Sequence, residues 1–243
     1  MKYLIDSHTH TIASGHAYST LHEMIEMAQK KELPILSVTE HAPSMPGTCH
    51  AFYFENLRII PRKYDSFTLL LGAEANIIDY NGTIDIYDDL ARRLDIVIAS
   101  LHQPCFKAGT VEENTRAYLN AMKNPNINII GHPDDSRIPV DYEKLVQGAK
   151  ASHVLLEVNN SSIAPTSFRS NSRENIKTYL TLCKELSVPI MLGSDAHICY
   201  DIANFKYAEE VIEEVNFPVQ LIANCNMDLI KEYLTNVPEG IFQ

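Results

Sequence analysis

The sequence predicts an α/β barrel built from seven parallel strands and the helices between them. Seven short apolar runs indicate strands, and helical stretches lie between most of them. Strands that alternate with helices form a mainly parallel sheet, and seven of them in one domain favour a barrel. An open, doubly wound sheet is the alternative fold. In the barrel, functional residues are expected at the carboxyl ends of the strands.

The individual elements follow from apolar runs and helical periodicity. The strands are expected at Tyr3–Asp6, Ile35–Thr39, Thr68–Ala73, Ile96–Leu101, Asn128–Gly131, Val154–Val158 and Ile190–Gly193. The first helix is expected to begin at a capping box formed by Thr20 and Glu23, because apolar residues then recur every three or four positions. Further helices are expected at Ile84–Arg93, Thr110–Met122, Asp141–Ala151, Ser172–Leu186, Ala203–Val215 and Met227–Leu234.

Length and composition are those of a soluble globular protein, and we expect one domain over residues 1–243. Hydrophobic residues make up 45% of the chain, but no apolar run approaches the ~18 residues of a membrane span. The N-terminus, MKYLIDSHTH, reaches polar side chains too soon for a signal peptide. The five cysteines are odd in number and form no CxxC pair, which argues against a disulfide framework. We therefore expect a cytoplasmic protein.

The charge balance favours small substrates. The formal net charge is −11, from 31 acidic and 20 basic residues, and no Lys/Arg-rich block interrupts it. Such a surface repels a long polyanion, so no long nucleic acid is expected as a partner, and no membrane either. A homo-oligomer stays open.

Histidines gather just past the carboxyl ends of the expected strands. Seven of the ten histidines lie there, and two carboxylates join them in a set of nine: His8, His10, His16, His41, Glu74, His102, His132, Asp195 and His197. In His8-x-His10 and Asp195-x-His197 the spacing puts both side chains on one face of a strand. Imidazole and carboxylate without thiolate suit zinc, manganese or iron. The set predicts a catalytic type of metal site.

Other ionisable residues near the expected strand ends are assigned no metal. His22 and His153 are interpreted as ordinary surface residues, and Glu40 and Glu157 as structural ones. His50 lies in the loop after the second strand, and whether it meets substrate stays open.

The ordered motifs HxH, TEH, GxE, SxH, GHP and GSDAH resemble those of the PHP family, named for polymerase and histidinol phosphatase. The resemblance runs from His8 to His197, about four-fifths of the chain, and is strongest to the small, stand-alone phosphatase branch. It implies a distorted (β/α)7 barrel with a trinuclear centre, commonly of zinc, manganese or iron. Zinc is the first choice here.

The resemblance also implies a role for each ligand. The first metal would be held by His8, His10, Glu74 and Asp195, the second by Glu74, His102 and His132, and the third by His16, His41 and His197. Glu74 would therefore bridge two metals. Glu74 and Asp195 would serve catalysis through a hydroxide shared between metals.

A small phosphate monoester is the expected substrate. Three divalent cations and two carboxylates would leave the pocket with roughly +4 charge, which attracts a small dianion. Paired metals lower the pKa of water toward ~7, so no separate general base is needed. Arg169, after the sixth strand, and Arg137, after the fifth, are candidates to bind phosphate oxygens.

Three alternatives use the same residues. A nuclease or nucleotide phosphohydrolase would need a groove for its leaving group, and the net negative charge of this chain repels a long nucleic-acid strand. An amidohydrolase would usually offer a bridging carbamylated lysine where Glu74 stands. A metal-binding protein without catalysis is the third. The leaving group, the native metal and the oligomeric state are open.

Overall fold

The computed structural model describes residues 1–242; Gln243, the last residue of the expected domain, lies outside the described part. Its strands form one sheet: β1 (Ile5–Asp6), β2 (Ile35–His41), β3 (Lys63–Tyr64), β4 (Phe67–Asn76), β5 (Ile96–Ser100), β6 (Ile129–Ile130), β7 (Leu155–Asn159) and β8 (Ile190–Gly193). Seven of them run parallel in the order β1-β2-β4-β5-β6-β7-β8. The short β3, which the apolar pattern did not indicate, pairs antiparallel with β4.

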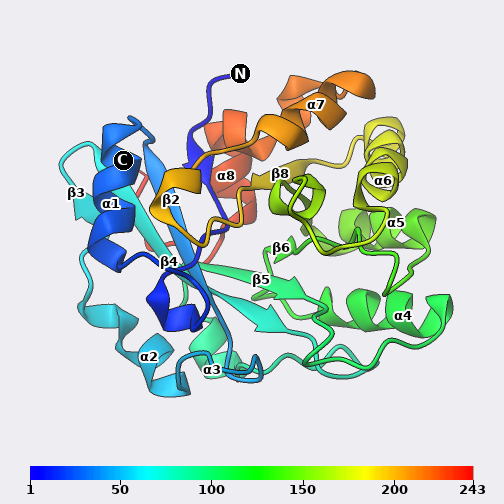
Figure 1. The fold of residues 1–243 in the computed structure, drawn as a ribbon, viewed down its shortest axis with the longest axis horizontal. Helices are drawn as coiled ribbons and strands as arrows, with labels where there is room; N and C mark the ends of the chain where they lie inside the picture. The colour runs from blue at the N-terminus through cyan, green and yellow to red at the C-terminus, as the bar shows by residue number, and fades with distance from the viewer. Residues whose placement is uncertain (243) are drawn as a thin grey trace.

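The helices cover the outside of this sheet. They are α1 (Leu21–Lys30), α2 (Ala51–Asn56), α3 (Asp88–Ala91), α4 (Val111–Ala121), α5 (Tyr142–Ser152), α6 (Ser172–Leu186), α7 (Lys206–Glu214) and α8 (Met227–Tyr233). Figure 1 shows α4, α5 and α6 side by side along one flank. Among residues 1–242, no helix is long and apolar enough to cross a membrane.

The sheet closes where β1 meets β8. Beyond the strand ends, the Asp195 amide donates to the His8 carbonyl at 2.9 Å, and the His10 amide donates to the Ala196 carbonyl at 2.9 Å. Within the strands themselves, the Asn224 side chain joins β8 to β1. Its Oδ1 accepts from the Leu192 amide at 2.6 Å, and its Nδ2 donates to the Ile5 carbonyl at 3.0 Å. The predicted distorted (β/α)7 barrel is confirmed, in place of the open sheet.

Alternate residues of each strand face the helices or the barrel interior. On β4, Leu69 and Leu71 belong to the core beneath the helices, whereas Leu70 belongs to an interior cluster. Glu74 lies four residues beyond Leu70 on the same face, near the carboxyl end. The interior cluster also takes in α8 through Ile230, so this helix covers the amino end of the barrel.

Two expected helices begin later than predicted, for local reasons. Ile84 forms an isolated bridge with Ile77, and the Asp85 carboxylate accepts hydrogen bonds from backbone amides, so this stretch is extended and α3 starts only at Asp88. Ala203 has φ of 54° and donates its amide to a buried carboxylate, so α7 starts only at Lys206.

Candidate metal centre

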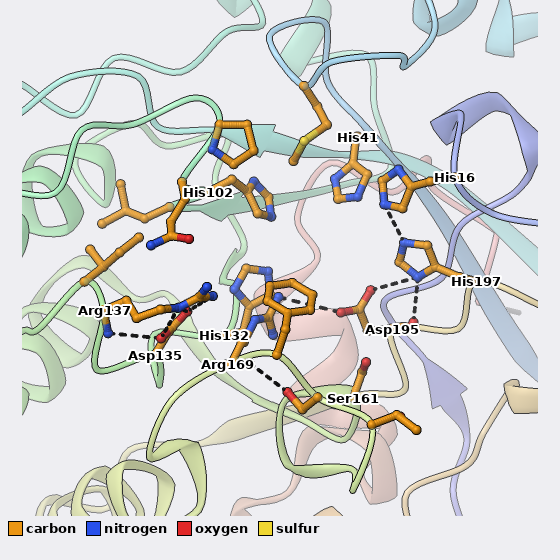
Figure 2. A pocket seen from close by; sticks show the side chains of 18 of the residues that line it. His16, His41, His102, His132, Asp135, Arg137, Ser161, Arg169, Asp195 and His197 are labelled. Atoms are coloured by element: carbon orange, nitrogen blue, oxygen red, sulfur yellow. Dashed lines mark hydrogen bonds and ion pairs between the residues drawn. The ribbon is translucent and has the colours of Figure 1, made fainter.

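All nine predicted ligands lie together at the carboxyl end of the barrel. They come from β2 and β4 and from the loops that follow β1, β5, β6 and β8. Six of these residues are buried, His102 and His197 are intermediate, and His16 is exposed. Figure 2 shows His16, His41 and His197 facing one another beside Asp195.

Glu74 lies at the centre of the first group. Its Oε1 is 2.7 Å from His132 Nε2 and 3.1 Å from His102 Nε2. Its Oε2 is 2.7 Å from His41 Nδ1 and 3.4 Å from His8 Nε2. His10 Nε2 lies 3.6 Å from the same Oε2. One fully buried carboxylate therefore faces five imidazoles, which is the arrangement expected of a bridging ligand.

Asp195 is the centre of the second group. Its Oδ1 lies 3.3 Å from His10 Nε2, 3.7 Å from His8 Nε2 and 3.5 Å from His197 Nδ1. The other nitrogen of the latter ring, His197 Nε2, is 3.1 Å from His16 Nε2. The two groups share His8 and His10, so the nine side chains form one continuous cluster.

The donor atoms of this cluster fit metal ions. Three sets of side chains each bring their donor atoms within 4.8 Å of one another: His10, His41 and His197; His8, His10 and Glu74; and His41, Glu74 and His102. Within the described residues, His41 Nδ1 and Glu74 Oε2 are buried and close, yet neither takes part in a hydrogen bond of acceptable geometry. Buried polar atoms are rarely left this way, and cations would satisfy both.

The electrostatics keep the carboxylates ionised. Burial favours a raised pKa for Glu74, but the positive charge that His102 and His8 can carry outweighs it and holds the pKa well below its usual value. Asp195 behaves alike, with burial opposed above all by His8. Conversely, burial would lower the pKa of His8, but the neighbouring carboxylates, Glu157 foremost, raise it well above its ordinary value. The carboxylates are thus ready as ligands at neutral pH.

Two predicted ligands adopt backbone conformations that are uncommon outside glycine. Asp195 has φ of 56° and His132 has φ of 26°. Such residues persist only where the surroundings hold them, and they cluster at functional sites. Here the Asp195 amide is fixed by the His8 carbonyl, and the His132 amide donates to Glu157 Oε2 at 2.8 Å.

Glu157 has a role that sequence reasoning did not assign. Its Oε1 is 2.7 Å from His8 Nδ1, and its other oxygen binds the His132 amide. A carboxylate on the far nitrogen of a ligand imidazole fixes the tautomer and the ring orientation. Space is so limited that a Cβ at Gly193 would lie 2.0 Å from Glu157 Oε1. The available signal was its position, since Glu157 alternates inward on β7 just below the barrel's carboxyl end.

Glu40 supports His10 through the hydroxyl group of Ser14. Ser14 Oγ donates to Glu40 Oε2 at 2.6 Å and lies 3.0 Å from His10 Nδ1. The Thr11 amide and the Tyr53 hydroxyl also donate to this carboxylate, which is buried. Glu40 is therefore structural, as predicted in kind, and its hydrogen bonds orient a ligand ring.

A cavity of about 660 Å³ opens over the cluster and contains both predicted arginines in its lining. Arg169 is nearly buried; its Nη2 lies 3.9 Å from Asp195 Oδ2 and its Nη1 donates to Ser162 Oγ. Arg137 is more exposed and its Nε lies 2.9 Å from Asp135 Oδ2. Figure 2 shows Arg137 on the side of the pocket away from His16 and His197, and Arg169 between Arg137 and Asp195.

The three remaining histidines lie outside this lining. His22 is exposed on α1, and the His153 ring stacks on Tyr233 with centroids 4.0 Å apart. His50 caps α2, since its Nδ1 accepts from the Phe52 amide at 3.3 Å.

Comparison with known proteins gives one consistent family. The model of the PHP domain matches residues 6–163. The chain is 45% identical over 234 residues to a protein named probable phosphatase from Clostridium novyi (strain NT), covering 96% of this chain and 95% of the relative. It is 43% identical over 235 residues to another of that name from Caldanaerobacter subterraneus subsp. tengcongensis, covering 96% and 92%.

A solved structure agrees in fold. It is the histidinol phosphate phosphatase of Lactococcus lactis in complex with zinc, L-histidinol and phosphate, with a TM-score of 0.61 and 20% identity. The match covers 89% of this chain and 95% of the other. The family, the barrel and the class of enzyme predicted from the motifs are all confirmed. This chain therefore belongs to the PHP domain family and is an enzyme of the phosphatase class.

Proposed function

We propose that this chain hydrolyses small phosphate monoesters at a centre of three divalent cations. The observation that carries the proposal is the convergence of nine donor side chains beneath a cavity whose wall contains Arg169. Zinc is the first candidate metal, because imidazole and carboxylate donors suit it, and manganese and iron are the alternatives. The ligands would be His8, His10, His16, His41, Glu74, His102, His132, Asp195 and His197.

The chain's own residues would have separate roles at the metal ions and at the phosphate. When bound, divalent cations lower the pKa of water, so that hydroxide is available at neutral pH, and neutralise charge on the phosphate. Glu74 and Asp195 contribute negative charge that offsets the repulsion between cations. Arg169, held by Ser162 beside Asp195, presents its guanidinium to phosphate oxygens. Arg137 would be a second, weaker phosphate contact, because Asp135 already takes one edge of its guanidinium.

The acidic surface supports a small substrate over a nucleic-acid strand. The net charge is −11, and the donor cluster lies at the bottom of a pocket. A strand would have to approach that surface against repulsion along its whole length, whereas a metabolite presents one phosphate. A nuclease function on the same residues is the alternative.

The test joins metal content to turnover. Undialysed protein should carry up to three equivalents of transition metal by elemental analysis, and phosphate release should vanish with a chelator and return with zinc, manganese or iron. The substrates should include histidinol phosphate, sugar phosphates, a nucleotide and a short single strand. Fewer than one equivalent of metal, or turnover that survives chelation, would contradict the proposal. Faster turnover of the single nucleic-acid strand than of the small phosphate esters would favour the nuclease.

We also propose that the chain acts as one domain in the cytoplasm. The five cysteines are free, which suits a reducing compartment, although their exposure ranges from buried to intermediate. Assembly into a homo-oligomer stays open, and light scattering of the metal-loaded protein would measure it.

A further inference from the structure

The cavity over the metal ligands has two sides of different chemistry. One side is formed by imidazoles and Asp195, with Arg169 beside them. The rest of the lining mixes polar side chains such as Gln103 and Asp135 with five apolar ones, which together are called the apolar side: Met45, Leu101, Pro104, Ile138 and Phe168. A volume of about 660 Å³ is in the range of pockets that hold a whole small molecule, which leaves room for more than a phosphate.

Phe168 is the most exposed part of the apolar side. It is 77% exposed, although it belongs to the lining of the cavity. Two guanidinium groups lie near its ring, with the Cζ of Arg137 5.2 Å and that of Arg169 6.0 Å from the ring centroid. A ring in this position offers a flat surface to a ligand next to the phosphate-binding arginine.

The apolar side is held in place before any ligand binds. Asp135 binds Arg137 and also accepts from the Ser170 amide at 3.2 Å. The Ser136 amide donates to the Ser170 carbonyl at 2.9 Å. These bonds join the loop after β6 to the loop that carries Phe168, so the wall does not have to be assembled by substrate.

We propose that this apolar side is the leaving-group subsite and selects phosphate monoesters whose alcohol carries a flat apolar ring. The inference rests on the phosphatase activity proposed above. With the phosphate beside Arg169, the alcohol extends over the rest of the cavity, where a ring removes its own surface and part of that of Phe168 from water. A polyhydroxylated alcohol would instead place hydroxyl groups against carbon and lose hydrogen bonds to water.

The test compares two substrates that both release a primary alcohol: benzyl phosphate and glycerol 3-phosphate. For the metal-loaded protein, kcat/KM for benzyl phosphate should exceed that for glycerol 3-phosphate by roughly tenfold or more. Phe168→Ala should lower this ratio by about tenfold, and Phe168→Leu should lower it by less. The matched control is Phe52→Ala, a similarly exposed phenylalanine on α2 outside the pocket lining, which should leave the ratio unchanged.

A binding measurement separates the subsite from the chemistry. Benzylphosphonate and methylphosphonate cannot be hydrolysed, so calorimetry reports their affinities without turnover. The metal-loaded protein should bind benzylphosphonate roughly tenfold more tightly, and Phe168→Ala should remove most of that difference. Equal affinities, or equal losses for both ligands in Phe168→Ala, would overturn the subsite even if phosphate is released. Selective benzylphosphonate binding without phosphate release from any ester would overturn the phosphatase activity and leave the subsite standing.

Discussion

The two ends of the barrel interior are built on the same strands but differ in chemistry. On β4, Leu70 and Glu74 face the same way and are both fully buried. Around Leu70 the interior is aliphatic, with Ile98 from β5 and Leu155 from β7. Around Glu74 it consists of imidazoles and carboxylates within about 4 Å of one another.

The difference assigns stability to one end and chemistry to the other. The amino end buries hydrocarbon, which favours folding directly. The carboxyl end buries ionisable groups, which is unfavourable unless they are paired or bound to metal. This division is expected of parallel barrels, whose sites lie at the carboxyl ends of the strands. Substitutions at the two ends should therefore affect different measurements.

The largest effect on turnover is expected from Glu74→Ala. Removing this carboxylate leaves five imidazoles without their shared partner and removes the charge that offsets repulsion between cations. Metal content should fall, and phosphate release should fall at least roughly a thousandfold. Elemental analysis and kcat/KM on the same samples measure both. Glu74→Gln should keep the shape but bind the metals poorly; full metal content with wild-type turnover in either variant would rule out a bridging role.

A large effect without metal loss is expected from Arg169→Ala. A charged hydrogen bond lost from the transition state costs about 2–4 kcal/mol, or roughly 30- to 1,000-fold in rate. Arg169→Lys should recover only part of this, because lysine lacks the planar fork. The measurement is kcat/KM on phosphate esters with metal occupancy verified. An alanine variant within about threefold of wild type would leave Arg169 without a role in turnover.

A smaller effect is expected from Glu157→Gln, because Glu157 contacts the ring of a candidate ligand, His8, and is not itself one of the nine. The amide keeps the size of the side chain but weakens the charged bond to His8 Nδ1, so the ring is held less firmly. Metal affinity should fall about 10- to 100-fold, and excess metal should restore turnover. Competition with a graded chelator measures the affinity. Unchanged affinity would make Glu157 a purely structural residue.

The smallest effect on turnover is expected from Leu70→Ala, at the other end. It should lower the free energy of unfolding by roughly 2–5 kcal/mol through the cavity it leaves. Metal content and kcat/KM of the folded protein should stay near wild type, which thermal unfolding and activity assays at low temperature would check. Loss of metal in Leu70→Ala would break the comparison, because the two ends would then not be separable.

The sequence was most informative where a residue's role depends on its own strand. Seven strands and nine donors could be placed because a histidine just past an apolar run lies at a strand's carboxyl end in any parallel barrel. Glu157 and Glu40 could not be given their roles, because these depend on partners 149 and 26 residues away in sequence. The helix predicted from Ile84 was too long for a local reason, because the bridge of Ile84 to Ile77 overrides helical periodicity.

The seam at Asn224 also sets an order in time during synthesis. β1 and the first histidine motif leave the ribosome at the start, but the strand that must lie beside them comes near residue 190 and the amide that joins both comes at Asn224. Until residue 195 is made, the first motif lacks Asp195, and until residue 224 it lacks the amide that joins β1 to β8. A chain that ends just before Asn224 therefore keeps all nine candidate ligands but loses the side chain that joins the two strands.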